Sequence, residues 1–443
     1  MLSRNSVTST EPLTGNDYID GILWGGKKLS SNRITYSFNS GSPSALTEDW
    51  NETEREVLEK ALETWSAVAD LEFVLVADDS YSADLRFNLG GDFESGVLGA
   101  FVPPGELGAG EGYFRPNELG EEDFADFEPG SEGFLAVIHE IGHGLGLAHP
   151  HDDAGGSSIY PGLDVSSSPE ISFGRYGLNQ GVWTTMSYND GLNRVGYQGS
   201  PMAFDIAAIQ HLYGANSEHA KGDNTYVMPV SNQDALYQGI WDTGGLDTIS
   251  ALSSFGDVTI DLRAAPLTGE NAGGYLSSDI SIDGGFTIAN GVKIENARGG
   301  SGDDELVGNQ LSNSLSAGEG DDTLTGGSQS DVMAGGADED LLIGCDPEAA
   351  NPGRGEYDRL TGGAGADIFA LGDGSEVYYQ GIGYATIADF NPLQGDRLQA
   401  TGVASDYSFE DARNGTYILH DGDRVGYVAG TAKLSTIFDF QFV

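Results

Sequence analysis

Three histidines and Glu140 fall within the segment HEIGHGLGLAH, which begins at His139. His139 and His143 are four residues apart, so on a helix they share a face and can bind one metal ion. Gly146 permits a sharp turn where a helix would continue, which lets His149 return as a third ligand. Three nitrogen ligands with an open fourth position are typical of catalytic zinc. Glu140 could then accept a proton from a zinc-bound water that attacks a peptide carbonyl.

Chance is a weak explanation for this segment. A bare HExxH is expected about once per hundred chains of this size, and the added glycine and histidine lower that frequency roughly another thousandfold. Two other interpretations are a helix whose histidines are simply buried and hydrogen-bonded, and a zinc site without catalysis. The complete pattern favours catalytic zinc over both.

A second segment, WTTMSYND over 183–190, supplies a methionine and a tyrosine. Zincins that share the longer histidine motif place a methionine turn beneath the metal, and Met186 fits that position. Tyr188 could reach the metal or a developing oxyanion. Met-x-Tyr alone is typical of ordinary core packing, but its place downstream of His149 favours the methionine turn.

The elements that must position these residues are short and mixed. Helical spacing of apolar residues predicts helices over 50–68, 131–147 and 203–213. Alternation or short apolar runs predict strands over 34–38, 73–76, 85–89 and 97–102. We therefore expect one α/β (α+β) catalytic domain over 21–215, preceded by a polar tail or short propeptide over 1–20.

The run Val97–Val102, just before Pro103 and Pro104, is a candidate edge strand. In zincins such a strand pairs with the extended substrate backbone and gives affinity through main-chain hydrogen bonds. A plain core strand is the equal alternative.

After Asn216 the helical periodicity gives way to an internal repeat of nine residues. Eight units run in register over 299–370, beginning with GGSGDDELV. Glycines at the turns permit positive φ, and the apolar residue at position eight would face inward from a short strand. A Gly/Asp-rich linker would have no reason to hold that register. We expect an all-β parallel β-roll within 216–443, ending in a β-sandwich-like segment.

Acidic residues at position six would bind calcium in this roll. Two nonamers make one coil, so Asp304, Asp322, Asp340 and Asp358 are expected to stack on one edge. Asn313, Asp331 and Asp367 would line the other edge, with a gap at Ala349 in the degenerate sixth unit. The sixth unit keeps its length, so the register is expected to survive it. Stacked carboxylates repel one another unless a cation lies between them, and this nonapeptide is that of the calcium-binding RTX repeat.

Composition limits the partners. Twenty basic and 69 acidic residues give a formal net charge of −49. That charge repels phosphate backbones and anionic lipid, so neither nucleic acid nor an acidic membrane is an expected partner. Cys345 is the only cysteine, which excludes an internal disulfide and a cysteine-ligated zinc site. Apolar runs are too short for a membrane-spanning helix, so we expect no stable membrane insertion.

These motifs and their order carry a resemblance over nearly the whole chain. HEIGHGLGLAHP, TMSY, PMAFDIAAIQHLYGAN, IWDTGGLDTIS and IADFNPLQGDRL resemble the serralysins, which are secreted metzincin proteases with RTX repeats. The resemblance implies His139, His143 and His149 as zinc ligands, Glu140 as general base and Met186 as the turn methionine. It also implies that Tyr188 is a further zinc ligand that swings away to stabilise the tetrahedral intermediate.

The hypothesis is a secreted, zinc-dependent endopeptidase that hydrolyses extracellular proteins and whose RTX domain folds with calcium. The N-terminus lacks the apolar region of a cleaved signal, and FDFQFV resembles the C-terminal signal of type I exporters, although a plain final strand is the alternative. Expected partners are protein or peptide substrates, the type I secretion machinery and a proteinaceous inhibitor, with the chain as a monomer. The rival functions are an RTX adhesin or surface module with a vestigial zinc site, and a metal-buffering matrix protein.

Overall fold

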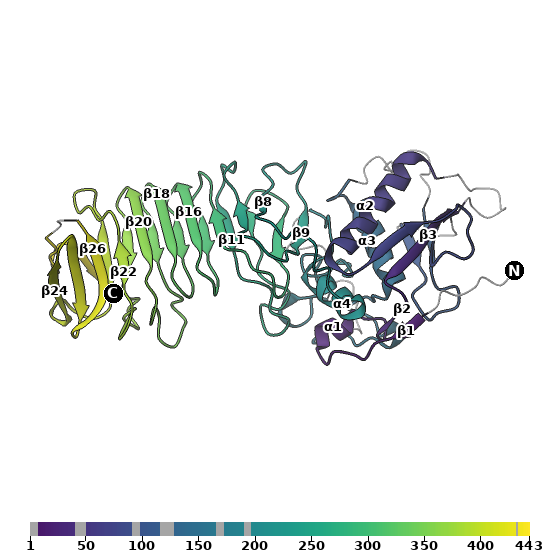
Figure 1. Ribbon diagram of the computed structural model, residues 1–443, viewed down its shortest axis with the longest axis horizontal. Helices are drawn as coiled ribbons and strands as arrows, with labels where there is room; N and C mark the ends of the chain where they lie inside the picture. The colour runs from purple at the N-terminus through teal and green to yellow at the C-terminus, as the bar shows by residue number, and fades with distance from the viewer. Residues whose placement is uncertain are drawn as a thin grey trace.

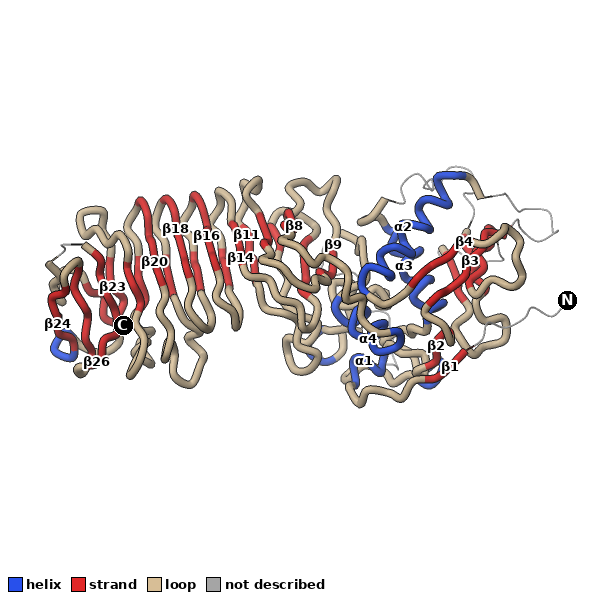
Figure 2. Tube along the Cα trace, viewed as in Figure 1, coloured by secondary structure: helices blue, strands red, loops and turns tan. Residues whose placement is uncertain are grey.

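The protein is elongated, with its helices gathered at one end and a stack of short strands forming the rest (Figures 1 and 2). The computed structural model describes residues 8–39, 50–90, 98–115, 128–164, 172–189, 196–430 and 433–443. Among these residues, no helix is long and apolar enough to cross a membrane.

The helical end is built on a five-stranded sheet in the order β4-β3-β5-β7-β6. Neighbours pair in parallel except β6 with β7, which are antiparallel. The strands are β3 (Arg33–Asn39), β4 (Glu72–Leu75), β5 (Leu85–Leu89), β6 (Gly99–Phe101) and β7 (Glu111–Phe114). The predicted strand over 97–102 is therefore β6, at the edge of this sheet, and Val97 lies outside the described residues.

Three longer helices carry the core of this end: α2 (Glu52–Val68), α3 (Glu132–Leu145) and α4 (Ala203–Tyr213). Each confirms a helix predicted from apolar spacing. Asn51 begins α2 with a capping box, in which its side chain accepts from the Glu54 amide and the Glu54 carboxylate accepts from the Asn51 amide. The fully buried Trp65 of α2 donates from its indole N–H to the Ile138 carbonyl of α3 at 3.2 Å. The two helices therefore pack directly on each other.

The N-terminal residues differ from the expected polar tail. β1 (Thr8–Thr10) pairs with β2 (Lys27–Leu29), and the Asn16 side chain caps a short helix, α1 (Asp17–Gly21). Tyr18 and Ile19 of α1 are buried, and the Tyr18 ring stacks on Phe204 of α4 at 5.5 Å. From Thr8 onward the segment is thus part of the fold, because two apolar side chains in a polar stretch find a tertiary partner.

Two sheets of mostly parallel strands form the long end of the molecule (Figure 1). One has the order β24-β25-β26-β22-β20-β18-β16-β14-β10-β8 and the other β12-β11-β15-β17-β19-β21-β23-β27, while β9 pairs separately with β13. In the first sheet the strands are β8 (Thr225–Val227), β10 (Thr248–Ser250), β14 (Asn296–Arg298), β16 (Ser314–Glu319), β18 (Val332–Ala337), β20 (Arg359–Ala364), β22 (Ala385–Ile387), β24 (Tyr407–Ala412), β25 (Gly415–His420) and β26 (Asp423–Ala429). The others are β9 (Tyr237–Ile240), β11 (Val258–Asp261), β12 (Ser278–Asp279), β13 (Gly285–Ile288), β15 (Glu305–Val307), β17 (Thr323–Thr325), β19 (Leu341–Ile343), β21 (Ile368–Ala370), β23 (Arg397–Ala400) and β27 (Phe440–Phe442).

The nonamer repeat builds this roll as expected in its first five units. Strands 18 residues apart pair in parallel, as in Leu315 with Met333 and Leu324 with Leu342. The position-eight side chains face the interior: Leu306, Leu315, Leu324, Met333, Leu342, Leu360 and Phe369 are all buried. Their row of apolar side chains is the core of the roll.

The sixth unit breaks the expected stacking. It loops out of the roll, so that β18 pairs with β20 through Met333 and Leu360, which are 27 rather than 18 residues apart. Asp358 consequently stacks on Asp331, and Asp367 stacks on Asp340. The expectation that register survives the sixth unit, with Asp358 on the edge of Asp340 and a gap at Ala349, was wrong. Without an aspartate at position six or an apolar residue at position eight, that unit has nothing to hold a coil in place.

The far end is closed by antiparallel strands β24, β25 and β26, while β27 pairs with β23. The terminal segment FDFQFV thus contains a final strand, as its plainer interpretation predicts.

Candidate metal centre

Helix α3 and the turn after it bring the three histidines together. Ser131 begins the helix by accepting from the Phe134 amide at 3.1 Å. The helix stops at Gly146, whose φ of 111° is left-handed and where a β-carbon would collide with the Lys27 carbonyl oxygen. The chain then runs back beside the N-terminal segment, since the Ala148 amide donates to the Ile22 carbonyl at 2.9 Å. This return places His149 opposite the helix.

Each of these histidines has an oxygen acceptor at its Nδ1 atom. The acceptors are the Thr185 carbonyl for His139 at 2.8 Å, the Leu147 carbonyl for His143 at 2.9 Å and the Asp152 carboxylate for His149 at 2.7 Å. A carbonyl oxygen can only accept, so the proton of His139 and of His143 is on Nδ1. The Nε2 atoms are therefore left with lone pairs.

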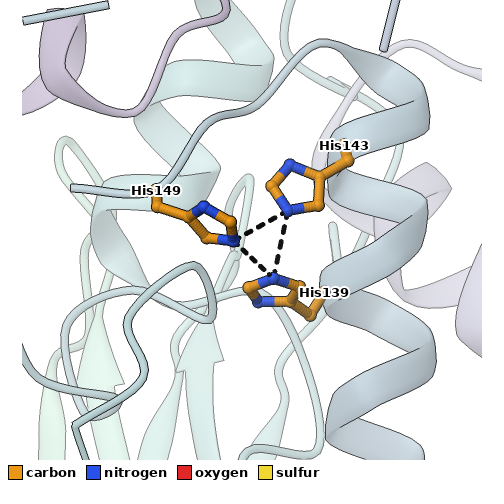
Figure 3. Close-up of side chains that lie close together, drawn as sticks. All are labelled: His139, His143 and His149. Carbon is orange, nitrogen blue, oxygen red and sulfur yellow. Dashed lines mark hydrogen bonds between the residues drawn. The ribbon is translucent and has the colours of Figure 1, made fainter. Parts of the chain in front are cut away.

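The three Nε2 atoms point at one common place (Figure 3). They lie 3.1 Å (His139 to His149), 3.1 Å (His143 to His139) and 3.0 Å (His143 to His149) apart. Converging lone pairs repel unless a cation lies between them, and nitrogen ligands on tetrahedral zinc would stand about 3.3 Å apart. This geometry fits a zinc ion held by three histidines.

Burial keeps these imidazoles neutral, which is the state that binds a metal. Burial, followed by the neighbouring imidazole of His143, lowers the pKa of His139 to about 3. Burial, followed by His149, likewise lowers the pKa of His143 to about 3. The pKa of His149 falls less, to about 4, because burial is opposed by its hydrogen bond to Asp152.

Glu140 follows His139 in α3 and lies beneath the edge strand. Its side chain packs against Gly99 of β6, where an added β-carbon would be 2.9 Å from the Glu140 Cγ atom. Burial raises the pKa of the Glu140 carboxyl to about 8, and a backbone hydrogen bond from Phe101 opposes that shift. A carboxyl with so high a proton affinity is suited to take up and release a proton near neutral pH.

Met186 contacts α3, and Tyr188 contacts two of the histidines. Met186 is fully buried, and its sulfur would be 2.9 Å from a β-carbon on Gly142 of α3. The ring of Tyr188 lies 5.5 Å from that of His139 and 4.6 Å from that of His149, and about half of the residue is exposed, at 52%. The methionine therefore packs on the helix that carries His139 and His143, and the half-exposed tyrosine borders the histidines on their solvent side.

The roll aspartates are buried, and one carboxylate oxygen of each accepts a hydrogen bond from the preceding coil. The Oδ1 atoms of Asp322 and Asp340 accept from the amides of Asp304 and Asp322 at 2.8 and 3.1 Å. The Oδ2 atoms of Asp322, Asp331, Asp340 and Asp367 are buried without a hydrogen-bond partner. Burial, and then nearby carboxylates, raise the pKa of Asp322 to about 7 and that of Asp340 to about 8. Buried orphan oxygens in a row are the arrangement that calcium would satisfy.

Family comparisons agree with this architecture in both halves. Residues 27–172 match the Matrixin family, and residues 203–407 match the family described as Peptidase M10 serralysin C terminal. The chain is serralysin-like. This result confirms the predicted fold class, a metzincin-type α/β (α+β) domain followed by a parallel β-roll, and zinc and calcium are the cofactors that such a chain takes.

Three curated relatives are each about one third identical to this serralysin-like chain. Serralysin of Proteus mirabilis is 32% identical over 333 residues, which are 66% of this chain and 63% of that protein. Serralysin C of Dickeya chrysanthemi is 33% identical over 319 residues, 65% of this chain and 61% of the relative. Metallopeptidase AprA of Pseudomonas marginalis is 30% identical over 320 residues, 64% of this chain and 61% of the relative. The matched part thus spans just under two thirds of each relative's length.

Two residues of the serralysin-like site were missed in the sequence. Asp152 was given no role there, and its carboxylate accepts from His149 Nδ1 at 2.7 Å. His151 was likewise given no role at the metal, and it is buried with its ring stacked on that of His149 at 4.9 Å. His149, His151 and Asp152 also form a group whose ligand atoms lie within 4.8 Å of one another. Their place just after the last histidine of the motif was the only sequence clue.

Proposed function

We propose that this chain is a secreted zinc-dependent endopeptidase. The observation that carries the proposal is the convergence of three Nε2 lone pairs beside a buried glutamate, under an edge strand. His139, His143 and His149 would hold the zinc ion. When bound, zinc would polarise the scissile carbonyl and lower the pKa of a water molecule.

The side chains would divide the remaining tasks. Glu140 accepts the proton of the attacking water and returns it to the leaving amine. Tyr188, on the open side of the histidines, donates a hydrogen bond to the oxyanion that forms on the substrate. β6 pairs with the extended substrate and sets the scissile bond above Glu140, which gives affinity without reading side chains.

We assign proteolysis and calcium binding to the two domains expected from the sequence. Residues 21–215 would form the protease and residues 216–443 the calcium-binding roll, with Asp304, Asp322, Asp331, Asp340, Asp358 and Asp367 as calcium ligands. Low calcium in a cell would leave these carboxylates in mutual repulsion, and extracellular calcium would fold the roll. That order suits type I export of an unfolded chain. Equal far-UV circular dichroism with and without a chelator would contradict this part of the proposal.

Casein cleavage in calcium buffer tests the activity. We expect cleavage that 1,10-phenanthroline abolishes, and that Glu140→Ala abolishes while zinc stays bound. A folded protein that binds one zinc ion and cleaves nothing would instead support the adhesin or surface-module hypothesis.

A further inference from the structure

A buried carboxylate on α4 binds the two residues that precede Met186. Asp205 lies in the first turn of α4 and is fully buried. Its Oδ1 atom accepts from the Thr184 hydroxyl at 2.6 Å, and its Oδ2 atom accepts from the Thr185 amide at 2.7 Å and the Met202 amide at 2.9 Å. Burial raises the pKa of Asp205 to about 6, and these hydrogen bonds oppose the shift, so the carboxylate is ionised at neutral pH.

The same residue, Thr185, contacts a histidine of the metal centre through its carbonyl. The Thr185 carbonyl, next along from the amide that Asp205 binds, accepts from His139 Nδ1 at 2.8 Å. The Thr184 hydroxyl also accepts from the Met186 amide at 3.1 Å while it donates to Asp205. Residues 184–186 are therefore fixed by one carboxylate, and their carbonyl in turn fixes the ring of His139.

We propose that Asp205 is a positioning residue for the metal centre. By holding the Thr185 amide, it keeps the carbonyl of the same residue aimed at His139 Nδ1, which leaves the Nε2 lone pair directed at the metal. Charge-assisted hydrogen bonds hold this peptide more rigidly than neutral bonds would. The inference rests on the proposed zinc site, but not on the proteolytic activity proposed for it.

Asp84 offers a matched control. Its Oδ2 atom accepts from the amide and the hydroxyl of Thr35, at 2.9 and 2.7 Å, so it too binds one threonine through a backbone and a side-chain donor. It joins β3 to the start of β5, and these bonds tie it to the sheet rather than to the metal centre. Loss of Asp84 should therefore affect stability without affecting the metal.

The experiment measures zinc affinity of the full-length protein in calcium buffer, by titrating zinc into the apo-protein against a competing chelator. We expect Asp205→Ala to weaken zinc binding about 10- to 100-fold. Asp205→Asn keeps an oxygen for the backbone amides and should recover part of that loss, whereas Asp84→Ala should bind zinc like the wild type. Thermal melts of all variants separate lost stability from lost affinity.

Asp205→Ala that folds and binds zinc as tightly as Asp84→Ala would overturn the proposal. If Asp205→Ala does not fold, Thr184→Val removes only the hydroxyl that joins Asp205 to Met186. Unchanged zinc affinity in both Thr184→Val and Asp205→Asn would then be the contrary result. A wild type that binds zinc but cleaves no casein would defeat the proposed activity and leave this test intact.

Discussion

Gly99 of the edge strand β6 lies against the side chain of Glu140, with room for a hydrogen atom but not for a methyl group. A β-carbon there would approach the Glu140 Cγ atom to 2.9 Å, closer than packed carbon atoms tolerate. The strand proposed to hold the substrate thus also sets the position of the proposed base.

Gly99→Ala should therefore lower kcat/KM for casein by about 10- to 100-fold, because a small displacement of a reacting group is costly. Zinc binding should persist, since the atoms nearest to a β-carbon at Gly99 belong to Glu140 and Tyr113 rather than to a histidine. Gly222→Ala is the control, as a β-carbon there meets nothing within 4 Å. Full activity in Gly99→Ala would show that Glu140 tolerates the displacement.

Asp152 should matter to zinc retention through His149. Asp152→Ala removes the acceptor of His149 Nδ1, which lies at 2.7 Å, so the ring loses its fixed orientation. We expect zinc affinity to fall about 10- to 100-fold. The neighbouring Asp153 is exposed to solvent, so Asp153→Ala should leave affinity unchanged. Equal affinities of the two variants would contradict the role given to Asp152.

Tyr188→Phe should reduce kcat more than it changes KM. The phenyl ring keeps the packing on His139 and His149, but the hydroxyl that would bind the oxyanion is gone. Loss of one such donor costs about 10²- to 10³-fold in kcat. The control is Tyr81→Phe at a side chain that is 76% exposed. Michaelis curves for a peptide substrate provide the measurement, and a pure KM effect would argue for a role in binding instead.

When calcium is removed by a chelator, the roll should be more stable at acidic pH than at neutral pH. In the folded, calcium-free protein, burial and then neighbouring carboxylates raise the pKa of Asp331 and Asp340 to about 8. Unfolded aspartate titrates near a pKa of about 3.9, so the folded state holds the extra protons between these values. The resulting stability is complete below about pH 4 and is lost as pH rises toward about 8.

In EGTA we thus expect a higher melting temperature for the roll at pH 5 than at pH 8. Calcium binds the ionised carboxylates, so its addition should raise the melting temperature most at pH 8. Circular dichroism melts at both pH values, with and without calcium, provide the check. A chelated protein that becomes more stable from pH 5 to pH 8 would show that these aspartates are not the groups in control.

The parts of this fold that the sequence could predict are those set by local spacing. Helix α3 and the converging histidines follow from a motif with one geometric solution, because Gly146 must end the helix for His149 to return. The buried state of Tyr18 was not predictable, since it depends on Phe204 far along the chain. Asp205 belongs to the same class: nothing near it in sequence shows that its carboxylate will bind the Thr185 amide.

The sixth nonamer shows a different limit. The number of residues in the unit is consistent with an unbroken register. A coil forms, however, only when its inward side chain adds to the apolar core and its turn adds an aspartate to the stack. Asn351 and Ala349 offer neither. The hydroxyl of the buried Tyr379 instead donates a hydrogen bond to the Asp358 carboxylate at 2.6 Å. Periodicity therefore predicts a coil only where its chemistry is also present.

Because the sixth unit loops out, the number of residues in the chain does not determine the length of the roll. Coils on either side of it still stack at the ordinary spacing of about 4.8 Å between strands. Nine residues can therefore be gained or lost at this turn without moving the helical end relative to the antiparallel strands β24–β26. The end-to-end length of such a roll depends on the number of stacked coils, so two rolls with different numbers of residues can have the same length.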